Sequence, residues 1–137
     1  MADVEHASFE GRLQQLMVAL EASLIEDAGA QLDELHPSEV AKLLEALTPK
    51  DRSLIWPRIK PSVQGEALKD VNEDVQTQLI DEMSVEALVK AAEGLDTDDL
   101  ADIVPNLPET AVHSLLLTLD YKHREHLKKV LTHHRHH

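Results

Sequence analysis

Carboxylates crowd one stretch of the chain. Between residues 81 and 109 there are nine acidic side chains and one basic side chain, Lys90. Three of the acids, Asp98, Asp99 and Asp102, fall within five consecutive residues. On a helix, residues three and four apart are neighbours, so Asp102 lies one turn from both of the others and their like charges repel. Clusters of this kind are suited to hard divalent cations, which take oxygen ligands.

The position of Asp102 favours a cation site over a plain solvated helix face. Asp96, Asp98 and Asp99 fit a helix start, where the helix dipole stabilises an acid by roughly 0.3–1 kcal/mol. Asp102 lies six residues beyond Asp96 and outside that reach, so nothing compensates its repulsion by its neighbours. Mg²⁺ typically binds one or two carboxylates and keeps several waters. The sequence therefore predicts a weak magnesium half-site at Asp98 and Asp102, with Asp99 beside them. A solvated helix face is the alternative.

No other cation loop or catalytic motif can be read from the sequence. An EF-hand loop starting at Asp96 is excluded, because its sixth residue is Ala101 instead of glycine and its twelfth is Leu107 instead of glutamate. The glycines form no phosphate-binding loop, and neither a serine nucleophile elbow nor a His-Glu-x-x-His motif occurs. We therefore expect that the protein is not an enzyme. A hydrolase that uses clustered carboxylates and a divalent ion is the least favoured alternative.

The histidines are a second possible metal signal. His123 and His126 share a predicted helix face close to Glu125, a spacing that can bind zinc adventitiously. Residues 132–137 form a histidine-rich tail, which we interpret as a tag remnant or a disordered end. Four of the nine histidines lie in its last five residues: His133, His134, His136 and His137.

Composition limits the classes of partner. The 137 residues suit a single domain. Thirteen basic against 26 acidic residues give a formal charge of −13, which argues against nucleic acid and anionic bilayers as partners. The absence of cysteine excludes disulfides and thiolate metal sites. No apolar run approaches the roughly 20 residues that cross a bilayer, and the first residues lack a signal-peptide pattern. We expect a cytoplasmic chain that does not itself insert into the membrane.

Apolar residues recur every twelve positions, and these anchor positions define the elements that carry the acids. The anchors are Leu35, Leu47, Ile59, Val71, Met83, Leu95, Leu107, Leu119 and Leu131. A predicted helix N-cap follows most anchors, and proline or acids come next, which is typical of a helix start. The predicted N-caps are Thr48, Asn72, Ser84, Asp96 and Asp120. Each unit is therefore a helix of about eight to ten residues and a tight corner.

Helices this short rarely persist alone, so they must pack on their neighbours. The repeat predicts an all-α fold, a right-angled superhelix (α-solenoid) of short helices with a twelve-residue period. Pro57 and Pro105 are predicted to end or kink helices. The repeat breaks its own pattern at a few positions. His36 and Lys60 are poor N-caps, and four polar residues occupy a position that is apolar in the other units: Arg52, Gln64, Gln76 and Arg124.

Before the repeat begins, apolar residues recur at intervals of three or four. They are Phe9, Leu13, Leu16, Met17, Leu20 and Leu24. This spacing predicts one longer amphipathic helix that caps the first repeat. We therefore predict a superhelical domain over residues 1–131, with a capping helical segment at 1–31 and short-helix repeats at 35–131.

The repeat resembles a known family. The stretch from Leu35 to Leu47, LHPSEVAKLLEAL, is echoed from Leu95 to Val104 as LDTDDLADIV. Both look like the cytosolic N-terminal domain of MgtE-type magnesium channels, and the resemblance covers roughly residues 13–131. The flagellar motor switch protein has a related fold. The unbroken run of units, together with the Asp-Asp-Leu-Ala-Asp segment at 98–102, favours the magnesium family.

The resemblance implies a regulatory function. In that family the domain is a superhelix followed by a pair of CBS domains, a connecting helix and a transmembrane pore, and the intact channel is a homodimer. Magnesium ions between the N-terminal domain and the CBS domains hold the closed state. The family's metal-contacting acids fall on Asp98 and Asp102, with Glu66 in an earlier unit as a weaker candidate. The expected cofactor is therefore Mg²⁺, shared with a partner domain on the cytoplasmic face of the membrane.

A protein-interaction scaffold is the main alternative. In this hypothesis the domain acts like the motor switch domain, and its acidic face binds a partner helix without metal. One simple experiment distinguishes the two hypotheses. Removal of divalent cations with a chelator abolishes partner binding in the first and leaves it intact in the second.

Overall fold

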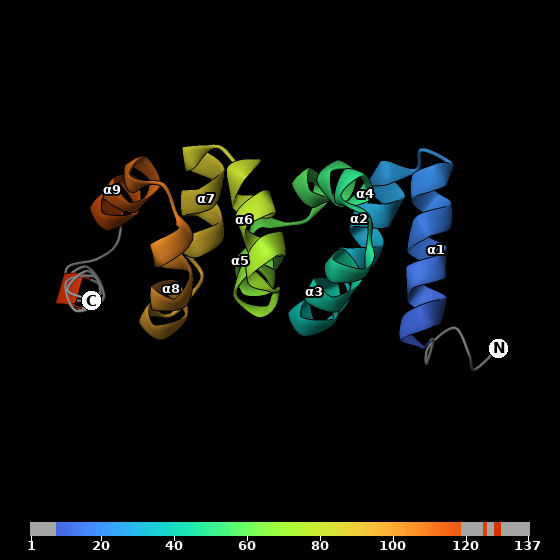
Figure 1. Ribbon diagram of the computed structural model, residues 1–137, viewed down its shortest axis with the longest axis horizontal. Helices are drawn as coiled ribbons and strands as arrows, with labels where there is room; N and C mark the ends of the chain where they lie inside the picture. Colours follow the sequence, from blue (N-terminus) through green and yellow to red (C-terminus); the bar gives the residue numbers. More distant parts are fainter. Residues whose placement is uncertain (1–7, 119–124, 126–127, 130–137) are drawn as a thin grey trace.

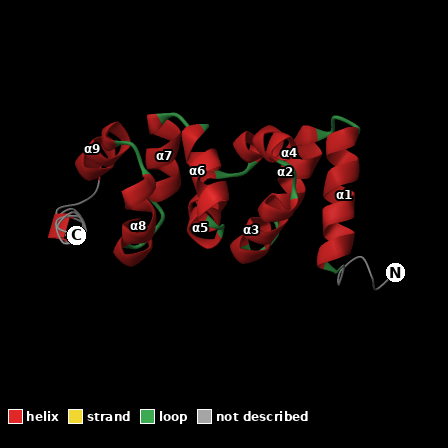
Figure 2. Ribbon diagram, viewed as in Figure 1, coloured by secondary structure: helices red, strands yellow, loops and turns green. Residues whose placement is uncertain are grey.

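The computed structural model describes residues 8–118, 125, 128 and 129. Over these residues every regular element is a helix, which confirms the all-α class (Figure 2). Two 3₁₀ turns, η2 (Trp56–Arg58) and η3 (Val104–Asn106), follow α4 and α8. The α-helices are α1 (Phe9–Glu21), α2 (Ile25–Asp33), α3 (Pro37–Ala46), α4 (Pro49–Ile55), α5 (Pro61–Asp70), α6 (Glu73–Asp81), α7 (Val85–Ala92), α8 (Thr97–Ile103) and α9 (Glu109–Thr118).

The helices form an elongated stack that runs from α1 at one end to α9 at the other (Figure 1). Helices two places apart in the sequence pack on each other: α3 on α5, α5 on α7 and α7 on α9. At the first end, α1 packs on α2 and α3. This pattern agrees with a repeat in which no unit is stable alone. The right-angled path of the superhelix stays a prediction.

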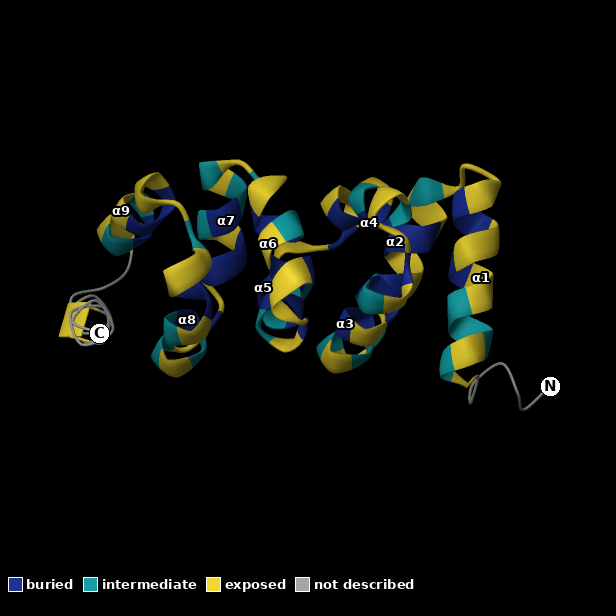
Figure 3. Ribbon diagram, viewed as in Figure 1, coloured by how far each residue is buried: buried dark blue, intermediate teal, exposed yellow. Residues whose placement is uncertain are grey.

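The anchor positions lie in or against the core, between the helices of the stack (Figure 3). Leu47, Ile59, Val71 and Leu95 are buried. Leu35, Met83 and Leu107 are partly buried and pack against the core. Leu119 and Leu131 lie outside the described residues. Trp56 is 1% exposed and is the largest of the fully buried side chains.

The predicted helix starts are confirmed at four corners. The side chains of Thr48, Asn72, Ser84 and Asp96 each accept a hydrogen bond from a backbone N–H three residues on, at 2.9–3.2 Å. The fifth predicted N-cap, Asp120, lies outside the described residues. Pro57 and Pro105 lie in η2 and η3, where α4 and α8 end, as predicted. A proline there costs no interior helical hydrogen bond.

The two poor N-caps are handled differently. The interpretation of His36 was wrong, because its Nδ1 accepts a hydrogen bond from the Ser38 backbone N–H at 3.1 Å and caps α3. Lys60 makes no side-chain cap, as predicted. Its own backbone N–H instead donates to Asp33 Oδ1 at 2.9 Å, an acceptor 27 residues earlier. Asp33, the last residue of α2, therefore fixes the backbone just before α5 but does not accept from the first-turn amides of that helix.

The polar residues that break the repeat also cap helices. Arg52, Gln64 and Gln76 are buried, and each donates a hydrogen bond to the backbone carbonyl eight residues earlier. The accepting carbonyls belong to Leu44, Trp56 and Leu68, in the last turns of the preceding helical segments, at 2.7–2.8 Å. The last carbonyls of a helix lack the regular partner four residues on, so these side chains supply an additional donor to them. The fourth residue of the set, Arg124, lies outside the described residues.

The prediction of a single helix up to Leu24 was wrong. α1 ends at Glu21, and Ser23 adopts a positive φ of 63°, which reverses the chain before α2 begins at Ile25. The sequence at this turn contains no glycine or proline that would predict it. α2 then packs against η2 so closely that a Cβ on Gly29 would lie 2.8 Å from the Arg58 carbonyl oxygen. The capping segment is therefore two helices.

Candidate functional site

α8 presents the predicted acids on its outer side. Leu100 and Ile103 are buried and fix the helix against the core. Asp98 and Asp102, one turn apart, are both exposed. Asp96 starts the helix, with its Oδ1 accepting the Asp99 backbone N–H at 2.9 Å. The short helix therefore holds two carboxylates toward the surrounding water.

The electrostatics at Asp102 are unfavourable. α8 has seven residues and Asp102 is the sixth, so its carboxylate lies in the last turn, where the helix dipole is negative. That turn contains no basic residue. Asp98 is in the first turn, and its carboxylate is one turn from that of Asp102. A cation near Asp102 would relieve both effects.

The other two predicted acids are engaged by a lysine. Lys69 Nζ lies 3.3 Å from Glu66 Oε1 and 3.4 Å from Asp99 Oδ2. The pair with Asp99 connects α5 to α8, which are in contact, whereas the pair with Glu66 lies within α5. The structure thus brings Glu66 and Asp99 together through Lys69, whereas neither Asp98 nor Asp102 has an ion-pair partner among the described residues. Sequence reasoning missed Lys69, because the only local signal was its i,i+3 spacing from Glu66.

These contacts change the pKa of Lys69. The hydrogen bond to Glu66 and, less strongly, that to Asp99 raise the pKa of its ammonium above the ordinary value, against an opposing effect of desolvation. A lysine whose pKa is raised by folding stabilises the folded state in full below its ordinary pKa. This stabilisation is lost as the pH rises through the raised value. Lys69 is therefore charged and paired at neutral pH.

The described residues do not make a complete metal cage. They contain no group of three or more His, Cys, Asp or Glu side chains placed to hold a metal ion. Two exposed carboxylates on one face of α8 still fit the chemistry of Mg²⁺, which needs one or two carboxylates and water. A second surface would complete the coordination. The predicted zinc pair, His123 and His126, lies outside the described residues.

A serine and a histidine meet at the start of α3. Ser38 Oγ lies 2.8 Å from His36 Nδ1, beside a groove of about 640 Å³ that Glu39 and Lys42 also line. The same Nδ1 caps α3, and the Glu39 carboxylate pairs with Arg12. The histidine is thus held as a helix cap, and its acidic neighbour is already paired with another residue. These contacts explain the cluster as a helix start.

In the part of the chain that the structure describes, no helix has both the length and the apolar character needed to span a bilayer.

Comparisons with known proteins point to one family. A family model described as the MgtE intracellular N domain matches residues 35–136. A solved structure described as the "Crystal structure of the soluble part of a magnesium transporter" is similar in fold, with a TM-score of 0.67 and 18% sequence identity. That alignment covers 89% of this chain and 48% of the other, so the chain spans about half the length of that protein. No curated protein matches the chain. Because the family model covers well over half of the sequence, the chain belongs to the MgtE intracellular N domain family.

Proposed function

We propose that this chain is the regulatory, magnesium-sensing domain of a magnesium channel or transporter. Its membership of the MgtE intracellular N domain family supports this proposal. The observation that carries the metal-binding part is the pair Asp98 and Asp102, exposed on α8 without a basic partner among the described residues. Carboxylates kept at one turn's spacing, with one at the negative end of a helix, are stabilised by a divalent cation.

The proposed mechanism is electrostatic docking. At low magnesium, a domain with a formal charge of −13 and an acidic pair of CBS domains repel each other and separate. At high magnesium, ions shared between Asp98, Asp102 and carboxylates of the CBS domains favour docking, and the docked form holds the pore shut. A ligand shifts an equilibrium only through its different affinities for the two states. An ion coordinated from both sides of an interface provides that difference.

The proposal fixes the partners and the location. The CBS domains and the transmembrane pore belong to the same transporter, which acts as a homodimer. The domain lies on the cytoplasmic face of the membrane, and nucleic acid is not a partner. The domain itself is a regulator and not an enzyme.

The metal-binding part can be tested on this chain by an NMR titration with MgCl₂. We expect the backbone amide signals of α8 to shift with a weak, saturable dependence on Mg²⁺, and the double variant Asp98→Asn, Asp102→Asn to lose about tenfold or more in affinity, because two carboxylate ligands become neutral amides. The matched control is Asp74→Asn, Asp81→Asn, which neutralises two exposed aspartates of α6. If the two double variants bind Mg²⁺ with equal affinity, Asp98 and Asp102 are not ligands of the ion.

An interaction scaffold remains the second candidate, favoured by a groove of about 450 Å³. Apolar Pro57, Pro61 and Met83 line it together with the charged Glu82 and Lys90. Apolar grooves of this kind are one way in which proteins bind an amphipathic helix of a partner. The scaffold function predicts that partner binding survives a chelator, whereas the sensing function predicts its loss.

A further inference from the structure

The Lys69 ion pairs lie at the edge of the proposed magnesium site. Lys69 reaches from α5 to Glu66 on its own helix and to Asp99 on α8. The side chains of Lys69 and Asp99 are 26% and 25% exposed, so both are held against the surface and not extended into solvent. Asp99 directly follows Asp98 in the sequence. Asp99 and Asp102 are three residues apart and therefore neighbours on α8, so a positive charge of the protein is paired with a carboxylate that borders the proposed site.

This ammonium affects a divalent cation in two ways. It repels a second positive charge that approaches α8. It also engages the Oδ2 atom of Asp99, which reduces the negative charge that this carboxylate can offer to an ion. Glu66 is held in the same manner, by the same Nζ atom at 3.3 Å. Of the four predicted metal-binding acids, Asp98 and Asp102 have no such contact among the described residues.

We propose that Lys69 is a tethered cation that competes with magnesium for the acidic surface and thereby sets the concentration at which the domain responds. This inference rests on the proposed function and adds its regulation. Lys69 lowers the affinity for Mg²⁺ and restricts the ligands to Asp98 and Asp102. Without Lys69, Asp99 and Glu66 become free to join the site.

The expected gain in Mg²⁺ affinity comes from the loss of the Lys69 ion pairs with Glu66 and Asp99, which compete with the ion. We expect Lys69→Met to bind Mg²⁺ about fivefold more tightly than the natural chain, which corresponds to about 1 kcal/mol at 1.4 kcal/mol per tenfold. Exposed ion pairs are usually worth about this much or less. Methionine keeps most of the length and apolar stem of lysine and removes its charge. Lys69→Arg keeps the charge, so its affinity should stay close to that of the natural chain.

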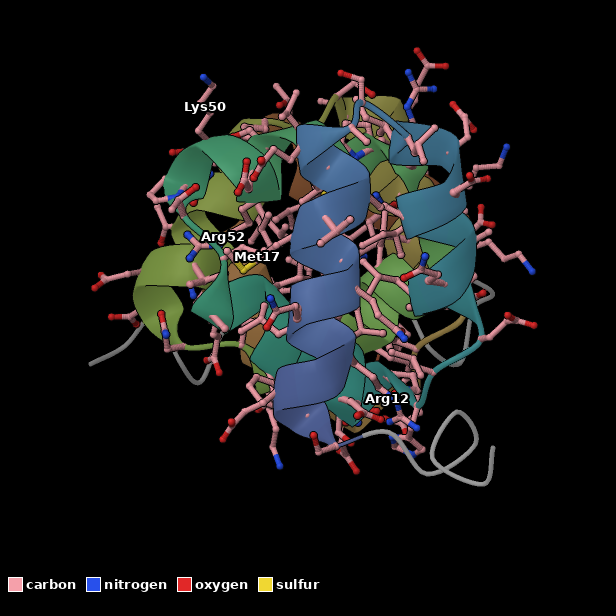
Figure 4. The ribbon with its side chains drawn as sticks, turned by 90° about the vertical axis from the view of Figure 1, so that its right-hand side faces the viewer. Arg12, Met17, Lys50 and Arg52 are labelled. Atoms are coloured by element: carbon pink, nitrogen blue, oxygen red, sulfur yellow. The ribbon has the colours of Figure 1, made fainter. Side chains whose placement is uncertain are left out.

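The control is Lys50→Met, which changes the net charge by the same amount. Lys50 belongs to α4 and is exposed, and Figure 4 shows its side chain extending away from the ribbon. Its removal should leave Mg²⁺ affinity within about twofold of the natural chain, because solvent and salt screen a distant surface charge. The difference between Lys69→Met and Lys50→Met therefore reports position and not net charge.

The measurement is an NMR titration of each full chain with MgCl₂ at fixed ionic strength, with circular dichroism as a check of folding. The inference is supported if Lys69→Met binds Mg²⁺ more tightly than the natural chain and Lys50→Met does not. This holds also if the natural chain binds too weakly to reach saturation. Equal affinities in Lys69→Met and Lys50→Met overturn it while the proposed function stands. No response of α8 to Mg²⁺ in any variant overturns both. If Lys69→Met unfolds, Lys69→Gln replaces it in the same comparison.

Discussion

Arg52→Met should lower the free energy of unfolding by about 3 kcal/mol, which lowers the melting temperature by roughly 10 °C. Arg52 is 8% exposed and donates from Nε to the Leu44 carbonyl and from an Nη atom to the Leu47 carbonyl, both at 2.8 Å. It also donates to Gln78 Oε1 of α6 at 2.6 Å. Methionine fills the space but removes the Arg52 donor from all three acceptors, so that among the described residues the Leu44 carbonyl keeps only the Leu47 backbone N–H at 3.3 Å, and weakly satisfied buried acceptors are costly.

A second arginine provides the control for this variant. Arg58 forms its ion pair with Glu26 at 2.8 Å, and the two side chains are 51% and 78% exposed. Arg58→Met should therefore change stability by no more than about 0.5 kcal/mol. Urea unfolding followed by circular dichroism measures both variants. An Arg52→Met protein as stable as Arg58→Met would mean that the carbonyls find other partners and that Arg52 does not hold the corner between α3 and α4.

Gly65→Ala should lower the free energy of unfolding by about 2 kcal/mol, although alanine is the better helix former. Gly65 lies in α5 against α7, and a Cβ at this position would lie 2.1 Å from the Ala91 carbonyl oxygen. Because that atom belongs to the backbone, a side-chain rotation cannot relieve the overlap. The two helices must move apart, and the core between them loses close packing.

Gly94→Ala is the matched control for this substitution. A Cβ on Gly94 would have no atom within 4 Å, and the backbone there has no positive φ. We expect its stability to lie within about 0.5 kcal/mol of the natural chain. Thermal unfolding of both variants decides the matter. Similar melting temperatures for Gly65→Ala and Gly94→Ala would show that α5 and α7 are less closely packed than the structure has them.

The sequence predicts the fold where the interactions are local. Thr48, Asn72, Ser84 and Asp96 cap their helices because an N-cap and its acceptor are three residues apart, within the range of a short pattern. The twelve-residue repeat of apolar residues likewise predicts where the helices turn and which side faces the core. The break at Ser23 could not be predicted in this way, because serine rarely adopts a positive φ and no turn residue accompanies it.

Contacts around a corner were harder to predict. Arg52, Gln64 and Gln76 are twelve residues apart, which was a usable signal, yet the carbonyls that they cap lie eight residues back in the preceding helical segment. A pattern of residue types does not contain this distance. The burial of these three side chains could not be predicted either. A polar residue is buried only where it finds a hydrogen-bond partner, and here that partner is known only from the structure.

The candidate site likewise contains features that local spacing predicts and contacts between residues distant in the sequence that it does not. The exposure of Asp98 and Asp102 follows from the helical spacing of the buried Leu100 and Ile103. The pairing of Asp99 with Lys69 does not, because these residues are 30 positions apart and meet only when α8 packs on α5. The sequence therefore predicts which acids face outward, and the structure adds the basic residue that engages their neighbour.

The central claim is that magnesium joins α8 to a neighbouring domain, and the most direct test is the affinity of this chain for the CBS domains of its transporter. Isothermal titration calorimetry at low and at millimolar Mg²⁺ measures it. We expect a complex that forms with Mg²⁺, dissociates when a chelator is added, and is weakened about tenfold or more by Asp98→Asn, Asp102→Asn. A complex of equal affinity in the presence of the chelator would contradict magnesium bridging and favour the scaffold function.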